Sequence, residues 1–570
     1  MSLRQVGKEG GYRILLPALM LVLAWAGLGC AEPSGVAGLS HQEALRQGEA
    51  MYRFGILPSG EPMQAIVQGD IPVDGTMFSC ESCHLRGGLG ALEGKIITLP
   101  TNGRELYKPY IKAAEETLPK WGSMHPSMQP KELRPAYTDE TLARVLWVGE
   151  DPAGRVLSYT MPRYELDERD MAILVYYLKN LSAELSPGVD PTTLRFATVY
   201  SEDADPQRVE VMLGVLDAHV RANNGQSRLQ ERRAKEGPFY KKKKSTAYRK
   251  WTLERWVLKG DPSTWPDQLE EYYRKQPVFA LLGGMVPGSW QPIHEFCEKN
   301  RIPNVLPITD YPVISGSDWY TVYFSKGHYQ EGEGAARFLR TQDEETRSRP
   351  IIQVFRDDLR GQTLAKGFRE TWQLLGQSPA EERPLAAGAE LDKGLLGGIY
   401  AEHPSATVLL WLEPRDLEAI KIPEQGQGRV LIGSARMLEG HLGKIPETLR
   451  QSLYLTYPYR LPEDMAKGEL VLRSWLKMKK LSLSDLRVQS DMYFVGWMLA
   501  GVTMMMENDF FRENFLDAID MMNDETYAIV TYPRLSFGQG QRYASKGCYL
   551  IQLGPGPQPE LIPRSEWVIH

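Results

Sequence analysis

The sequence of 570 residues predicts a multidomain protein, with an all-α domain followed by a larger α/β half that has two lobes. Three observations predict this. The pattern C-x-x-C-H occupies residues 80–84, between segments whose apolar residues recur at helical spacing. A seam with two prolines and a glycine follows at residues 185–191. From Leu194 onward, short strand-like runs alternate with amphipathic helical stretches, as in a mainly parallel sheet.

The N-terminus, residues 1–29, has the form of a signal peptide. An apolar run over residues 14–28 is shorter than a transmembrane span and follows three basic residues, Arg4, Lys8 and Arg13. We therefore expect an exported protein, in which residues 30–39 tether the first domain.

The end of this run, Ala26-Gly27-Leu28-Gly29-Cys30, resembles a bacterial lipobox. The resemblance implies cleavage before Cys30 and lipidation of its thiol. Ala31 stands where lipoproteins kept at the inner membrane have aspartate, so an outer-membrane anchor is expected. Gly27 occupies a position where leucine is more usual, so a soluble periplasmic form is the alternative.

Two amphipathic helices are expected to bound the first domain, residues 40–183. The first begins with Ser40-His41-Gln42-Glu43, which has capping-box form, and contains Gly48, where another helix could cross closely. The last begins at Asp167, a plausible N-cap, and buries residues spaced as Met171, Leu174, Leu178 and Leu181.

Between these helices, C-x-x-C-H is the attachment pattern of a covalent c-type haem. The thiols of Cys80 and Cys83 would add to the two vinyl groups, and the imidazole of His84 would bind the iron. Zinc would need a second pair of ligands, and neither Cys297 nor Cys548 has a metal-like neighbour. Since the motif occurs once, one haem is expected.

Met161, followed by a proline and the last helix, is the expected second axial ligand of the iron. Rival ligands stand in the preceding loop: Met124, His125 and Met128. A carbonyl near Leu99 is expected to accept the other ring N–H of His84.

The order of these features over residues 39–181 resembles class I c-type cytochromes. The resemblance implies crossing terminal helices, one-electron transfer, and periplasmic or outer-membrane redox proteins as partners. An insertion at residues 57–75 and a long loop from His84 to Met161 depart from compact members of that class.

Composition adds little. The chain is 42% hydrophobic and 24% charged with a formal net charge of -6, so no nucleic-acid partner is expected. Cys297 and Cys548 allow either a disulfide or two buried thiols.

The second half, residues 194–570, follows a linker at residues 184–193. Strands are predicted at residues 194–200, 277–284, 304–308, 319–324, 350–355 and 407–412. Helices are predicted at residues 205–221, 290–300, 330–340 and 363–375. This alternation indicates two α/β lobes.

This half resembles type I periplasmic binding proteins of the branched-chain amino acid family. The resemblance lies in segments 283–289, 355–362, 491–497 and 533–538. It implies a cleft that binds a small amino-acid-like ligand, with Ser289 near its carboxylate, Glu413 near its amino group and Tyr329 as a third contact. Capping or loop contacts are equally compatible with these three residues. A basic island at residues 230–251 departs from the family; it could steer an acidic partner or be a solvated loop.

No nucleotide fingerprint, nucleophile triad or H-E-x-x-H motif is recognised, so we expect a binding protein or electron carrier rather than an enzyme. The leading hypothesis is a monohaem cytochrome that transfers electrons at the cell envelope and has a ligand- or partner-binding domain. The alternative is a redox-responsive small-molecule receptor or the substrate-binding protein of a transporter.

Overall fold

The computed structural model describes residues 35–93, 96–112, 131–235, 249–424, 429–522 and 529–569. The chain forms two compact units, Met1–Glu184 and Leu185–His570. The predicted signal peptide, Cys30, and the rival ligands Met124, His125 and Met128 lie outside the described residues. Within the described ranges, we find no helix with the length and apolar character needed to span a membrane.

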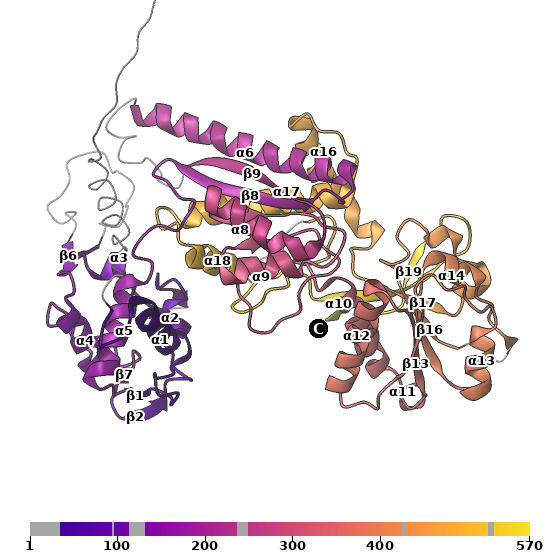
Figure 1. The fold of residues 1–570 in the computed structure, drawn as a ribbon, viewed down its shortest axis with the longest axis horizontal. Coiled ribbons are helices and arrows are strands. Elements are labelled where there is room, and N and C mark those ends of the chain that lie inside the picture. The colour runs from indigo at the N-terminus through magenta and orange to yellow at the C-terminus, as the bar shows by residue number, and fades with distance from the viewer. Residues whose placement is uncertain are drawn as a thin grey trace, which may run out of the picture. The chain divides into compact units, whose positions relative to one another are not determined.

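Unit 1 is built around the crossing of its two longest helices, α1 (His41–Phe54) and α5 (Glu168–Asn180) (Figure 1). Both predicted N-caps are confirmed: Ser40 accepts from the backbone N–H of Glu43, and Asp167 accepts from that of Asp170. A Cβ at Gly48 would lie 2.3 Å from the Cβ of Tyr177, so glycine allows the close crossing.

Shorter elements complete unit 1. The helices are α2 (Cys80–His84), α3 (Gly103–Leu106) and α4 (Asp139–Val148). A three-stranded sheet has the order β2 (Ile71–Asp74), β1 (Gln64–Val67) and β7 (Arg163–Tyr164). Two-stranded ladders pair β3 (Leu92–Glu93) with β4 (Ile96–Ile97), and β5 (Tyr110–Lys112) with β6 (Lys131–Arg134). The expectation of an all-α domain is therefore wrong in part, because the insertion at residues 57–75 forms the β1–β2 hairpin, which pairs with β7.

Lobe 1 of unit 2 contains a five-stranded sheet. Its order is β12 (Thr321–Val322), β11 (Asn304–Val305), β10 (Ala280–Leu282), β8 (Thr193–Ser201) and β9 (Lys250–Leu258). All pairs are parallel, as the alternating pattern predicts. The predicted helix at residues 205–221 extends further, as α6 (Pro206–Lys235), into the start of the basic island.

Helices cover both faces of this sheet (Figure 1). Leu194 and Phe196 of β8 pack in a core with α6, α16 (Pro462–Met478) and α17 (Leu486–Met505), while Ala197 and Val199 pack on the other face. That second face carries α8 (Trp265–Lys275) and α9 (Gln291–Lys299). α18 (Arg512–Asp520) joins the first core. This alternation makes β8 a strand buried on both sides.

Lobe 2 has a mixed sheet in the order β14, β13, β15, β16, β17, β18, β19. Its parallel strands are β14 (Glu381–Leu385), β13 (Ile351–Arg356), β15 (Thr407–Trp411), β16 (Leu431–Ser434) and β17 (Leu453–Tyr457). The antiparallel strands are β18 (Gly547–Leu553), β19 (Leu561–Pro563) and β20 (Val568–Ile569). Its main helices are α10 (Gly327–Thr341), α12 (Leu359–Leu374), α13 (Leu395–Glu402) and α14 (Pro414–Ala419). The prediction of two α/β lobes is confirmed.

Candidate functional site

The C-x-x-C-H motif forms the short helix α2. Cys80 is buried in the core of unit 1, where its sulfur lies 3.7 Å from the hydroxyl of Tyr164, whereas Cys83 is exposed. Neither thiol is in a disulfide. Because residues three apart share one side of a helix, α2 presents both sulfurs to the same side.

The ring of His84 is oriented by a backbone carbonyl. Its Nδ1 lies 2.8 Å from the carbonyl oxygen of Leu99, which confirms the expected contact. Burial lowers the pKa of His84, so the neutral imidazole is favoured; an Nδ1–H that donates to this carbonyl leaves the Nε2 lone pair for a metal. The hydroxyl of Thr98, beside Leu99, donates to the carbonyl of Cys83 at 2.7 Å and ties the same loop to α2.

Met161 packs, partly buried, against the same hydrophobic cluster that contains Cys80. Its backbone is fixed because Arg163 donates to the carbonyl of Met161 at 2.7 Å and to that of Leu157 at 2.9 Å. Large apolar side chains beside these residues are solvent-exposed: Met77 is 74%, Tyr159 59% and Leu99 38% exposed. Two thiols, a neutral imidazole, a thioether and adjoining apolar surface are a donor set that fits a covalent haem.

The second candidate site lies in unit 2, at the carboxyl ends of the parallel strands of both lobes. A cavity of about 640 Å³ contains Asp310 and Tyr311, which follow β11, with Glu413, after β15, and Arg436, after β16. A smaller cavity of about 220 Å³ shares Asp310 and Tyr311 and also contains Arg487. Open α/β sheets bind ligands at this edge.

A charged group joins the lobes within these cavities. Asp310 of lobe 1 pairs with Arg436 of lobe 2 and lies 3.2 Å from Nη2 of Arg487 at the start of α17. Partial burial would by itself raise the pKa of Asp310, but the two guanidinium groups hold it well below its usual range. The ring centroid of Tyr459 lies 5.1 Å from Arg436 Cζ and 4.9 Å from Arg487 Cζ. A second interlobe contact joins the hydroxyl of Tyr311 to Arg360.

Glu331 of α10 lies beneath this group and is fully buried. Its Oε2 accepts from the hydroxyls of Ser434 and Thr456, each at 2.8 Å, and its Oε1 lies 3.5 Å from Nε of Arg436. These two hydrogen bonds fix the Glu331 carboxylate in place, and its negative charge stabilises the guanidinium of Arg436 on the side away from the cavity.

Glu413 lines the larger cavity, as the resemblance implies for a ligand contact. It is also the N-cap of α14, in a capping box with Asp416. Asp416 is held by Arg356, which donates to its two oxygens at 3.0 and 2.6 Å. This buried pair positions the loop that contains Glu413.

The structure places Ser289 and Tyr329 elsewhere. The hydroxyl of Ser289 accepts from the backbone N–H of Gln291 at the start of α9, and that of Tyr329 donates to Glu370 at 2.9 Å, between α10 and α12. Neither residue lines the two interlobe cavities. The sequence analysis did not select Asp310, Arg436 or Arg487 as site residues. A signal existed for Arg436, because the run 430–436, V-L-I-G-S-A-R, has the pattern of a buried strand that ends at a charged residue.

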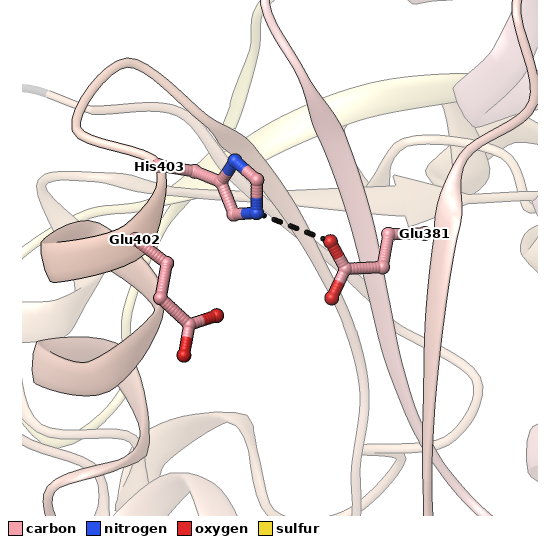
Figure 2. A group of neighbouring side chains, drawn as sticks. All are labelled: Glu381, Glu402 and His403. Carbon is pink, nitrogen blue, oxygen red and sulfur yellow. Dashed lines mark ion pairs between the residues drawn. The ribbon is translucent and has the colours of Figure 1, made fainter.

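A separate cluster on lobe 2 contains Glu381, Glu402 and His403, with Nε2 of His403 3.2 Å from Glu381 (Figure 2). Arg383 pairs with both carboxylates. Since the guanidinium already balances these largely exposed acids, the cluster is an ion-pair network between the edge strand β14 and the end of α13.

Cys297 and Cys548 are buried free thiols, in the cores of lobe 1 and lobe 2 respectively. Of the two alternatives, the structure therefore has the buried thiols. Burial raises the pKa of both groups, which makes them poor nucleophiles.

Comparisons with known proteins give no family. Neither a protein-family model nor a curated protein matches the chain. Similar solved structures include an ABC transporter substrate-binding protein from Sphaerobacter thermophilus, at 14% identity and a TM-score of 0.47, covering 66% of this chain and 98% of that one. A branched-chain amino acid ABC transporter from Thermus thermophilus with bound valine has 10% identity and a TM-score of 0.44, covering 67% and 97%. A solute binding protein from R. palustris in complex with benzoate has 11% identity and a TM-score of 0.43, covering 66% and 98%. Likenesses at this level assign neither a ligand nor an activity to this chain.

Proposed function

We propose that the protein is an exported, lipid-anchored receptor for a small organic ligand, whose first unit carries one covalent haem. The interlobe cavity is the observation that carries the proposal. It lies where parallel α/β sheets bind ligands, and side chains from both lobes line it, so a bound molecule would contact both.

In unit 1, Cys80 and Cys83 would hold the haem covalently, and His84 and Met161 would be its axial ligands. When bound, the group supplies reversible one-electron transfer. The carbonyl of Leu99 orients the His84 ring, and the Arg163 guanidinium fixes the Met161 backbone. These contacts would keep His84 and Met161 in place in both oxidation states of the iron. Such a site suits electron transfer and leaves no coordination position for a substrate.

A second candidate function is a one-electron carrier whose lobes dock a periplasmic or outer-membrane redox protein. It uses the same haem-binding residues as the receptor, with Met161 packed against the cluster that contains Cys80, and it requires no small ligand in the cavity.

Thermal unfolding of the full haem-bearing chain against amino acids, amides, small carboxylates and alcohols tests the receptor. A ligand that binds the folded state raises the midpoint by an amount that grows with its concentration. A saturable shift for one chemical class is expected. No shift across the panel would contradict the receptor and favour the docking scaffold.

A further inference from the structure

The guanidinium of Arg436 is a buried cation on the wall of the cleft, with its side chain 2% exposed. Its Nη1 donates to Asp310. Its Nε lies 3.5 Å from the buried carboxylate of Glu331, and its Nη2 makes no hydrogen bond to any residue that the structure describes. Because a guanidinium has five donors, Arg436 has hydrogen-bonding capacity that the protein does not use.

Two neighbours have the same property. The Nε of Arg487 and the hydroxyl of Tyr459 are buried and also lack a hydrogen-bond partner among the described residues. Both guanidinium groups stand near the Tyr459 ring, so these unmet groups gather in one place. Buried polar groups in proteins are almost always paired, and such a gathering indicates the position of an external acceptor.

Three carboxylates balance this charge, and they differ in how firmly they are held. Glu439, with a side chain that is 61% exposed, lies 3.3 Å from Arg487 and lines the larger cavity. Glu331 has a fully buried side chain and accepts from Ser434 and Thr456. Asp310 has a side chain that is 41% exposed, and it lines both cavities. In the described hydrogen bonds, its carboxylate accepts from Arg436 and Arg487. Asp310 is therefore the exchangeable partner of the arginine pair.

We propose that the ligand is an organic carboxylate, and that its carboxylate group replaces Asp310 on Arg436 and Arg487. This inference rests on the receptor function and names its ligand class. Asp310 acts as an internal competitor that balances the two arginines when the cleft has no ligand. Pro287, Tyr311 and Met437 provide apolar contacts for part of a ligand in the larger cavity, whose other lining residues are mostly charged.

Three molecules with the same branched apolar body separate the ligand classes: isocaproate has a carboxylate, isoamylamine an ammonium group, and leucine both. Their binding to the full haem-bearing chain is measured by calorimetry. We expect isocaproate to bind and isoamylamine not to bind. Leucine is expected to bind no more tightly than isocaproate, since the arginines recognise the carboxylate alone.

Variants then locate the carboxylate. Asp310→Asn, which removes the competitor while keeping its shape, should bind isocaproate about tenfold or more tightly than the natural chain. Arg436→Gln should bind it roughly 30-fold or more weakly. Arg473→Gln, an exposed change on α16 in an ion pair with Glu469, is the matched control and should leave affinity unchanged.

Asp310→Asn removes the negative charge that Asp310 places beside two buried arginines, so the variant is expected to be less stable. Isocaproate should then raise its unfolding midpoint by more than it raises that of the natural chain. Equal affinities for the natural chain and Asp310→Asn, undiminished binding to Arg436→Gln, or no binding to either chain would overturn the inference. Binding of another class that is insensitive to Arg436 would overturn it while leaving the receptor function intact.

Discussion

Nδ1 of His84 lies 2.8 Å from the carbonyl oxygen of Leu99, fifteen residues further along the chain. This contact fixes the plane and tautomer of the imidazole that follows Cys80 and Cys83. An orienting acceptor is typical of a metal-binding histidine, so the local structure around the motif is consistent with haem ligation.

Covalent haem attachment is the first prediction. The double substitution Cys80→Ala and Cys83→Ala, in the full chain exported by cells that mature c-type cytochromes, should abolish haem that survives denaturing electrophoresis. The control Cys297→Ala and Cys548→Ala changes the two buried thiols of unit 2 and should retain it. Covalent haem in the first variant would show that another residue makes the attachment.

The identity of the second axial ligand is the next prediction. Met161→Leu should remove the spectroscopic signature of thioether ligation and lower the reduction potential by on the order of 0.1 V, within the roughly 0.8 V that axial ligands span. Met128→Leu changes one of the alternative ligands that the sequence offers, and should leave the spectroscopic signature and the reduction potential unchanged. The opposite pattern would assign the ligand to Met128.

Close helix crossing at Gly48 predicts a stability effect confined to unit 1. Gly48→Ala places a Cβ 2.3 Å from the Cβ of Tyr177 and should destabilise the unit by about 1–3 kcal/mol. Melting followed at the haem absorption band reports this unit. Gly225→Ala, on α6 of unit 2 with open space around the new methyl, should leave melting at the haem band unchanged. If both variants melt alike, the crossing does not need glycine.

A buried acid in lobe 1 predicts a pH dependence of stability. Burial raises the pKa of Asp491 to about 7, although the nearby Arg487 and Thr531 oppose the rise. The folded pKa exceeds the unfolded value of about 3.9, so this contribution to stability is full below about pH 4 and is lost as the pH rises through 7.

Asp491→Asn should therefore flatten the stability of unit 2 between about pH 4 and 7, and stabilise it at pH 8 by roughly 1–3 kcal/mol. Chemical denaturation at several pH values measures both effects. The control Asp267→Asn changes an exposed carboxylate of α8, and its stability should depend on pH in the same way as that of the natural chain. Unchanged pH dependence in Asp491→Asn would assign the effect to other groups.

Local patterns predicted much of the fold. Ser40 and Asp167 cap the predicted helices, because capping depends on residues within one turn. Strands such as β8 and β13 were predictable from apolar runs that are buried on both faces. The β1–β2 hairpin was not predicted, since short strands at the edge of a small domain have little periodicity.

The cleft was only partly predictable. Glu413 directly follows a predicted strand, so its position at the sheet edge could be inferred. Arg436 meets Asp310 across 126 residues of sequence, and no local pattern encodes such a pairing. Tyr329 was expected in the cleft, but its hydroxyl instead bonds Glu370 on the neighbouring helix α12, a choice set by helix packing.

A redox-responsive receptor requires that ligand binding in unit 2 depends on the redox state of unit 1. The most direct test measures the haem reduction potential of the full chain with and without a saturating ligand. Linkage requires that a tenfold difference in affinity between the oxidised and reduced protein shifts a one-electron potential by about 59 mV. The receptor predicts such a shift, with a matching difference between dissociation constants measured in the two redox states. Tight binding with identical constants and an unmoved potential would contradict it, and would leave a ligand-binding module that shares a chain with an independent electron carrier.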